Sequence, residues 1–165
     1  MNLSSIFQMQ KELDNKIELK AKKLNPNLNS NDLQVQKSLA LIIEAGEFIN
    51  EVQSFKYWKL NKNIQKNKVT EEFADLLHFF VNLAINYDLK PIIEPKIVND
   101  DINIQFQQLF IAITDFMQNS NQDTLLYAFE IALGSFVSLG YTQNDLNEAY
   151  LLKNNTNHQR IVNNY

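Results

Sequence analysis

Apolar residues recur along this chain three and four positions apart, and no stretch alternates apolar and polar residues as a strand would. In the first apolar stretch, Ile6, Met9, Leu13 and Ile17 would share one face of a helix. The pattern therefore predicts helices joined by short connections. The six expected helices cover about residues 3–24, 31–52, 71–87, 101–117, 123–139 and 142–153.

Helix breakers and capping residues agree with these boundaries. All three prolines fall between the expected helices. A loop rich in Lys and Asn, residues 59–68, precedes the third helix, for which Thr70 is the expected N-cap. Gly140 is placed to end the fifth helix, and Thr142 with Asp145 matches a capping box for the sixth. The expected fold is one all-α domain, residues 1–165, built as a bundle of about six helices.

Composition narrows the classes of function. The 165 residues include no cysteine, so a disulfide framework or a thiolate metal site is excluded. The net charge is −4 and basic residues form no cluster, so we expect no binding to a nucleic-acid backbone. No apolar run reaches the roughly 18–20 residues that cross a membrane, and the first residues do not resemble a signal peptide. We therefore expect a cytoplasmic protein that binds no membrane.

Two pairs of acidic residues with the same spacing carry the candidate chemistry. Glu44 and Glu47 lie in the second expected helix, and Glu72 and Asp75 lie in the third. Residues three apart share a helix face, so each pair directs two carboxylates to one side. If the two helices pack together, four carboxylates converge, and a hard divalent cation would remove their repulsion. The pattern predicts a magnesium site, since Mg²⁺ prefers carboxylate, phosphate and water oxygens.

Acidic residues three apart are also common on solvated helix surfaces, so the pattern alone leaves that alternative open. Apolar neighbours surround both pairs, which favours a buried site. Gly46 lies inside the second helix and suggests close approach by a neighbouring helix or a ligand, because glycine there costs about 1 kcal/mol relative to alanine. His78 shares the face of Asp75, although a lone helical histidine is commonly a packed core residue.

Four segments, residues 44–51, 55–59, 71–79 and 149–160, resemble the dimeric all-α dUTPases of the MazG-like, all-α NTP pyrophosphatase superfamily. Their sequences are EAGEFINE, FKYWK, EEFADLLHF and AYLLKNNTNHQR. The match spreads over nearly the whole chain in the order of the family. The chain departs from the pattern near its C-terminus, where Ile161 replaces the usual Gln and Asn164-Tyr165 replaces Gly-Tyr.

The resemblance implies a homodimer that hydrolyses dUTP, and also dUDP, with two or more Mg²⁺ ions in each site, releasing dUMP and pyrophosphate from dUTP. Glu44, Glu47, Glu72 and Asp75 match the metal ligands. Glu47 is our choice for the base that accepts a proton from the attacking water, although the sequence alone cannot choose among the four carboxylates. Seven further residues match substrate-binding positions: Gln10, Lys56, Trp58, His78, Lys153, Asn157 and Arg160.

The C-terminal segment predicts a phosphate clamp. Lys153, Asn157 and Arg160 are spaced i, i+4 and i+7, so they share one face if the sixth helix continues past Asn155. Few apolar residues stabilise this segment, and we expect residues 153–165 to form a mobile lid that orders over the triphosphate.

Two alternatives remain open at this stage. The metal motif cannot separate a dUTPase from a dCTPase or a broad-specificity house-cleaning pyrophosphatase. Only the base pocket can, since uracil offers an N3–H donor and an O4 acceptor whereas cytosine reverses both. The second alternative is a catalytically inactive helical dimer that acts as a binding module.

Overall fold

The computed structural model describes residues 1–27 and 29–162, and its described part contains helices but no strand. This confirms the all-α prediction. Asn164 and Tyr165, two of the positions that depart from the family pattern, lie outside the described residues. The helices are α1 (Ser4–Leu24), α2 (Ser30–Val52), α3 (Lys66–Asn86), α4 (Ile102–Gln118), α5 (Gln122–Ser138) and α6 (Gln143–Val162).

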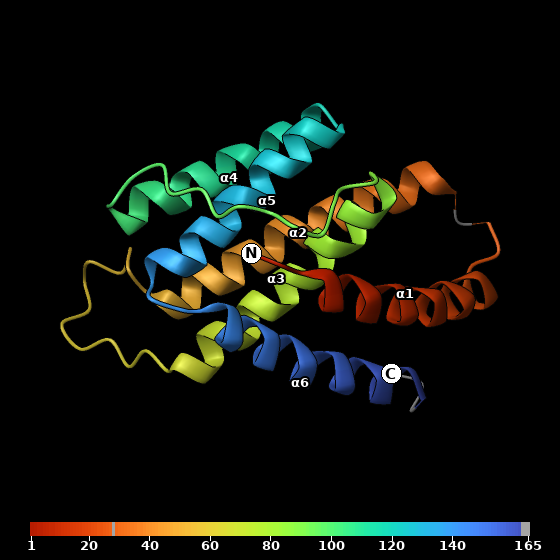
Figure 1. Ribbon diagram of the computed structural model, residues 1–165, viewed down its shortest axis with the longest axis horizontal. Helices are drawn as coiled ribbons and strands as arrows, with labels where there is room; N and C mark the ends of the chain where they lie inside the picture. The colour runs from red at the N-terminus through yellow and green to blue at the C-terminus, as the bar shows by residue number, and fades with distance from the viewer. Residues whose placement is uncertain (28, 163–165) are drawn as a thin grey trace.

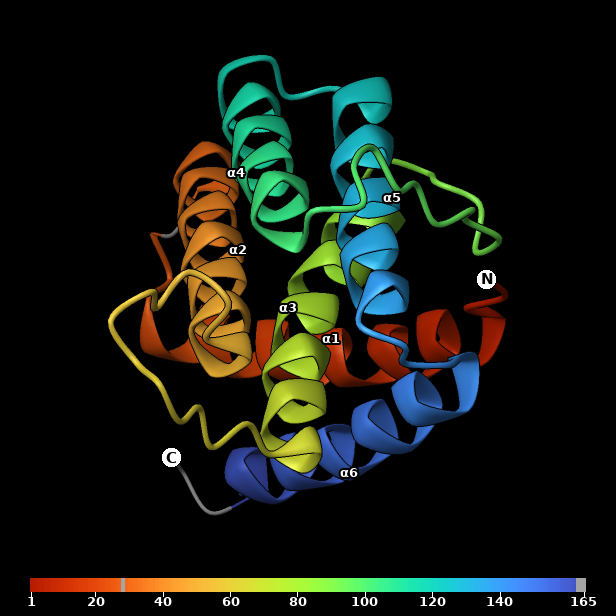
Figure 2. The same cartoon turned by 90° about the vertical axis from the view of Figure 1, so that its left-hand side faces the viewer.

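Helix α3 occupies the centre of the molecule, and α1, α2, α5 and α6 all pack against it. Helices α4 and α5 form a pair, and α4 also contacts α2. In Figures 1 and 2, α1 and α6 lie together at one end of the bundle, opposite the outer ends of α4 and α5. This arrangement leaves one face of α3 for the core and another for the cavity between α1, α2 and α6.

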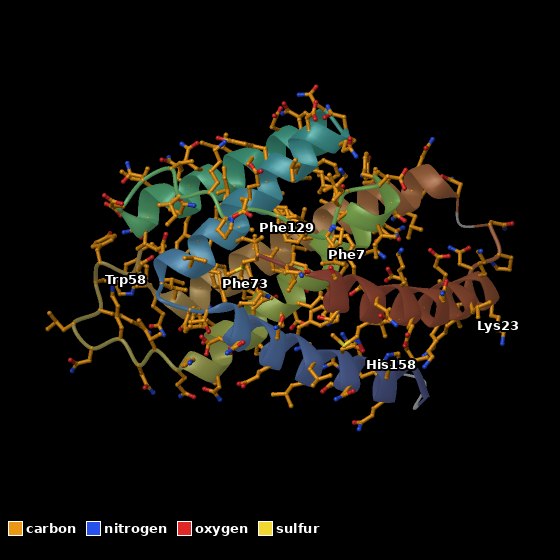
Figure 3. All side chains as sticks on the ribbon, in the orientation of Figure 1. Phe7, Lys23, Trp58, Phe73, Phe129 and His158 are labelled. Atoms are coloured by element: carbon orange, nitrogen blue, oxygen red, sulfur yellow. The ribbon has the colours of Figure 1, made fainter. Side chains whose placement is uncertain are left out.

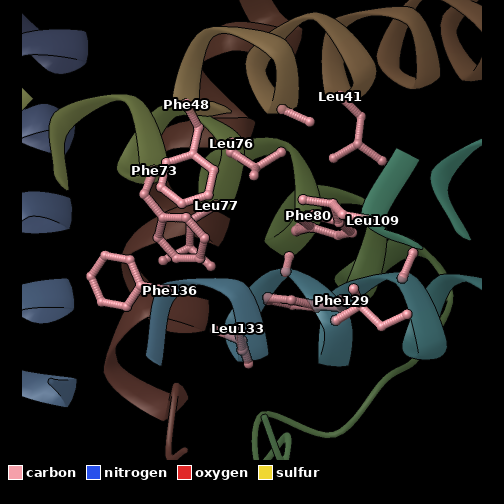
Figure 4. Packing of buried hydrophobic residues seen from close by; sticks show 14 of the residues in the cluster. Leu41, Phe48, Phe73, Leu76, Leu77, Phe80, Leu109, Phe129, Leu133 and Phe136 are labelled. Carbon is pink, nitrogen blue, oxygen red and sulfur yellow. The ribbon is translucent and has the colours of Figure 1, made fainter. Parts of the chain in front are cut away.

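Aromatic packing joins α2, α3 and α5 in the core (Figure 4). The rings of Phe73 and Phe136 stack with centroids 4.2 Å apart, and those of Phe80 and Phe129 stack at 4.7 Å. Phe48 meets the edge of Phe73 at 5.0 Å. All five rings are at most 1% exposed. Burying an aromatic side chain of this size stabilises a fold by about 1.5–3 kcal/mol, so these contacts fix how α3 faces α2 and α5.

Two helices are longer than the sequence predicts. Helix α3 begins at Lys66, so the prediction that Thr70 caps it is wrong. Thr70 lies inside the helix, where its hydroxyl donates to the Asn67 carbonyl, and the burial of Val69 explains the extra turn. Helix α6 continues to Val162 because it packs against α1 and α3. At its start the predicted capping box is present: the Thr142 amide donates to Asp145 Oδ2 at 2.8 Å.

Within residues 1–27 and 29–162, the close approach that was expected at Gly46 is not found. A Cβ atom at Gly46 would meet no described atom within 4 Å. Gly134 in α5 is the position of close approach, since a Cβ there would lie 1.9 Å from the Lys96 carbonyl oxygen. Residues 94–99 cross α5 at this point, where the Lys96 amide donates to the Glu130 carbonyl. Buried Gln105 holds the same segment through hydrogen bonds to its backbone.

Within the described residues, no single helix has both the length and the apolar character needed to cross a membrane. The bent pair Gln122–Ser138 and Gln143–Ile161, which meet at 110°, passes the same test when taken together, on length and composition alone.

We expect Gly134→Ala to lower the free energy of unfolding by about 1–3 kcal/mol, because the new methyl group must push the segment around Lys96 away from α5. Thermal and urea unfolding measure the change. Ser138→Ala, at an exposed position of the same helix, is the control and should change stability by about 0.5 kcal/mol or less. Equal stability of the two variants would contradict the close approach.

Candidate functional site

Three acidic side chains from α2 and α3 meet beside the central helix. Glu44 comes from α2, and Glu72 and Asp75 come from α3. One carboxylate oxygen from each lies within 4.8 Å of the others, and all three side chains are partly buried. They converge because α2 and α3 pack along one another through their apolar faces, which turns the acidic face of each helix toward the same edge.

Burial and mutual repulsion raise the pKa values of this acidic cluster. Desolvation, followed by the charges of Asp75, Glu47 and Glu72, raises the pKa of Glu44 to about 7. Desolvation is also the main reason that the pKa values of Glu72 and Asp75 are raised. A divalent cation would relieve both effects, and an all-oxygen donor set suits a hard ion such as Mg²⁺. The residues present therefore fit a metal site.

Glu47, the fourth predicted ligand, lies beside this cluster. Its side chain is exposed, and it is not one of the three residues whose oxygens converge. Its charge nevertheless raises the pKa values of Glu44 and Glu72, which places it within electrostatic range of both. Glu47 is thus close to the cluster without being enclosed by it.

Lys153 on α6 supplies positive charge to the acidic cluster. Its Nζ lies 2.5 Å from Asp75 Oδ2 and 3.1 Å from Glu71 Oε1, and its side chain is 12% exposed. Burial alone would lower the pKa of Lys153, but the hydrogen bonds and charges of these two carboxylates raise it. The pKa of Asp75 stays raised because desolvation outweighs the effect of Lys153. The residue that the sequence assigned to phosphate therefore pairs with carboxylates here.

A cavity of about 610 Å³ adjoins the acidic cluster, between α1, α2, α3 and α6. This volume suits a ligand of nucleotide size. The cavity brings together six of the predicted site residues: Gln10, Glu44, Asp75, His78, Asn157 and Arg160. Apolar side chains also line it, among them Ile17, Ala21, Leu24 and Leu33.

A buried polar network forms one wall of this cavity. The Nδ1 atom of His78 lies 2.7 Å from Gln10 Oε1, and the Tyr150 hydroxyl donates to the same oxygen at 2.5 Å. The Gln10 amide nitrogen donates to Asp14 Oδ1 at 2.7 Å. Asp14 and Asn82 also line the cavity, and the sequence analysis missed both. Their spacing in the sequence could have identified them, because Asp14 follows Gln10 by one helical turn and Asn82 follows His78 by one turn.

Lys56 and Trp58 are not brought to the cavity within this chain. Lys56 donates to the Asn50 carbonyl at 3.1 Å. Trp58 is 61% exposed. Among the aromatic rings of the described residues, its ring packs only against those of Phe55 and Tyr57. Figure 3 shows Trp58 at the opposite end of the molecule from His158, which lies on α6 near the cavity. The predicted contacts of Lys56 and Trp58 with substrate remain predictions.

The fold and the site together define an all-α protein with a candidate metal centre at one edge of a nucleotide-sized cavity. A family model described as dUTPase matches residues 2–165, so the chain belongs to the dUTPase family. No curated protein matches the chain at a significant level. Membership confirms the resemblance seen in the sequence motifs, and it supports a dUTPase-type hydrolase that acts on a nucleotide. Glu44, Glu72 and Asp75 could bind the metal ion that such an activity suggests.

We expect the metal-free protein to lose stability as the pH rises from about 5 to about 8. The pKa of Glu44 is about 7 in the folded chain, against an ordinary value of 4.5, so the folded state binds this proton more tightly than the unfolded state. The resulting stabilisation is complete below pH 4.5 and is lost as the pH rises through 7.

Thermal unfolding in a chelating buffer measures this dependence. Glu44→Gln should show a smaller fall in Tm over the same range, because its side chain does not ionise. Glu94→Gln, at an exposed position outside the acidic cluster, should behave like the unchanged protein. An equal fall in Tm for Glu44→Gln and the unchanged protein would contradict the assignment.

Proposed function

We propose that this protein is a magnesium-dependent dUTP diphosphatase that hydrolyses dUTP to dUMP and pyrophosphate. The observation that carries the proposal is the meeting of Glu44, Glu72 and Asp75 at the edge of a cavity that Arg160 also lines. A triphosphate site needs carboxylates that hold a metal ion, and it needs a positively charged side chain that binds the phosphate oxygens. Membership of the dUTPase family supports the uracil nucleotide as substrate.

In this proposal magnesium is held by four carboxylates, those of Glu44, Glu47, Glu72 and Asp75. Two or more magnesium ions occupy each site. Bound magnesium would neutralise phosphate charge and make a water molecule more acidic. Glu47 remains our choice for the general base, because its carboxylate is exposed and is not one of the three that converge. A carboxylate that is not fully committed to a cation can accept the proton of the attacking water.

Three residues of α6 would bind the phosphates. Asn157 and Arg160 line the cavity, and Lys153 lies one turn before Asn157 at the acidic cluster. Arg160 offers a planar pair of donors that suits phosphate oxygens, whereas Lys153 offers a point charge. Because α6 is helical through Val162, residues 153–162 of the proposed lid, which spans residues 153–165, would close by moving the end of a helix.

A dCTPase or a broad-specificity pyrophosphatase is the alternative within the same chemistry. The acidic cluster serves all three activities equally, and the distinction falls to the residues that contact the base. Gln10 and His78 line the cavity and are the candidates for that contact. An inactive helical dimer that only binds nucleotide is the alternative of a different class.

Release of pyrophosphate from dUTP, dCTP, dTTP and dATP, with and without Mg²⁺, tests the proposal. We expect dUTP to be preferred and the reaction to require the metal. Asp75→Asn and Glu47→Gln should each lower turnover by orders of magnitude while the helical content is kept, and Glu94→Gln should leave turnover unchanged. Comparable kcat/KM for dUTP and dCTP would favour the alternative pyrophosphatases. Near-normal turnover in both site variants would refute the assignment of the acidic cluster.

We also propose that the protein is a homodimer. Val35, Leu39 and Ile43 form an apolar stripe on the outer face of α2, and each is at least 47% exposed in the single chain. A second cavity of about 880 Å³ lies between α2 and α4, is lined mainly by apolar side chains and includes Gly46. Apolar surface of this extent is typical of a protein–protein contact, and a second copy would supply the neighbour that Gly46 lacks within the described chain.

Ile43→Asp should therefore shift the mass in solution from dimer to monomer, because a buried, unpaired charge opposes the contact. Light scattering at micromolar concentration measures the mass. Leu60→Asp is the matched control, since Leu60 is 101% exposed and lies outside the stripe. A monomeric mass for the unchanged protein would refute the dimer.

A further inference from the structure

The Gln10 side chain lies between three buried or partly buried polar groups. Its amide nitrogen is 2.7 Å from Asp14 Oδ1, and its amide oxygen is 2.7 Å from His78 Nδ1 and 2.5 Å from the Tyr150 hydroxyl. Gln10, His78 and Tyr150 are 3%, 7% and 0% exposed. Solvent therefore has little access to the hydrogen bonds that the Gln10 oxygen accepts from His78 and Tyr150, so these two donors depend on Gln10.

Asp14 determines which way the Gln10 amide points. A carboxylate accepts hydrogen bonds and donates none, so the Gln10 atom that faces it must be the NH₂ group. Burial raises the pKa of Asp14, and hydrogen bonds from Asn82 and Gln10 and the charge of Lys37 act against that rise. With the NH₂ group directed at Asp14, the Gln10 oxygen must face His78 and Tyr150.

The orientation of the Gln10 amide in turn determines which ring nitrogen of His78 carries the proton. Because Nδ1 faces a carbonyl oxygen, it must carry the proton and donate. Burial lowers the pKa of His78 to about 3, so the ring is neutral near pH 7 and holds a single proton. The other ring nitrogen, Nε2, is then an acceptor. It is buried and has no hydrogen-bond partner in residues 1–27 and 29–162, although His78 lines the cavity.

We propose that Asp14 is a positioning residue for ligand selection: through Gln10 it holds His78 in the Nδ1–H tautomer, which leaves Nε2 as an acceptor for an N–H or O–H group of a ligand bound in the adjoining cavity. Two groups of a uracil deoxynucleotide have this chemistry, the ring N3–H and the sugar 3′-hydroxyl. The selection of ligand rests on the proposed nucleotide function, whereas the state of His78 in the free protein does not.

Nitrogen-15 NMR of the imidazole rings in the free protein tests the first half of the proposal, which is that His78 is held in the Nδ1–H tautomer. The chain contains two histidines, and a His158→Gln variant assigns the signals. We expect His78 to show the Nδ1–H tautomer near pH 7 in the unchanged protein. An Nε2–H tautomer or a charged ring would overturn the proposal whether or not the protein hydrolyses dUTP.

Asp14→Asn tests the direction of control, because an Asn side chain can face Gln10 with either a donor or an acceptor. We expect His78 to become a mixture of tautomers in this variant. Tyr150→Phe removes one donor to Gln10 but keeps Asp14, so it should keep the Nδ1–H tautomer. An unchanged tautomer in Asp14→Asn would overturn the proposal. If that variant does not fold, Asp14→Ser applies the same test, since its hydroxyl also donates or accepts.

Kinetic measurements test the second half of the proposal, which is that His78 selects a ligand with a hydrogen-bond donor. Asp14→Asn should lower kcat/KM for dUTP by about tenfold, mainly through KM, as expected for one misplaced buried hydrogen bond. Glu18→Gln, an exposed charge one turn further along α1, should have no such effect. In the unchanged protein, a large loss with N3-methyl-dUTP would identify the base as the donor, and a large loss with 2′,3′-dideoxy-UTP would identify the sugar. Full activity with both analogues would overturn the selection of a donor at His78.

If the NMR results are as expected but no nucleotide is hydrolysed, the proposed function fails while the control of His78 by Asp14 stands. If dUTP is hydrolysed but Asp14→Asn leaves both the tautomer and KM unchanged, the function stands and the role of Asp14 fails.

Discussion

Burial of one face of α3 against α2 and α5 is the constraint on which the rest of this structure depends. The stacked rings of Phe73 with Phe136 and of Phe80 with Phe129 hold α3 in one rotation about its axis. Because a helix cannot turn one face without turning the others, this rotation also directs Asp75 toward α2. The carboxylate site is thus a consequence of apolar packing on the opposite side of the same helix.

The packing brings like charges together at a cost. Carboxylates from two helices are held with oxygens within 4.8 Å, partly out of water, and their pKa values rise accordingly. Lys153 offsets part of that cost from α6, which carries the proposed phosphate-binding residues. The acidic cluster and the C-terminal helix are therefore linked electrostatically, since whatever neutralises Asp75 also changes the position that Lys153 prefers.

The cavity combines this charged edge with a wall of hydrogen-bonded polar side chains. His78 of α3 and Tyr150 of α6 share one acceptor, the side-chain oxygen of Gln10 on α1. Hydrogen bonds between buried groups rigidify this wall of the cavity. One buried atom, His78 Nε2, is left without a bonded partner among the described residues, and in our proposal it accepts a hydrogen bond from the ligand.

The sequence by itself determined the helical class, the two acidic pairs and the capping box at Thr142, because each depends on residues within one or two turns of each other. It could not determine the start of α3, where burial of Val69 against other helices adds a turn that local signals oppose. Nor could it distinguish Gly46, where no other described segment would meet an added Cβ, from Gly134, where the segment around Lys96 would.

Within the site, periodicity predicted that four carboxylates would converge, those of Glu44, Glu47, Glu72 and Asp75. The structure brings three of them together and leaves Glu47 exposed beside them. Only the tertiary structure decided that Lys153 pairs with Asp75, that Asp14 joins Gln10 and His78, and that Trp58 lies elsewhere in this chain. The physical reason is that hydrogen bonds and ion pairs between separate helices depend on how the helices are rotated and spaced. Burial of the core sets that rotation and spacing, which no local pattern records.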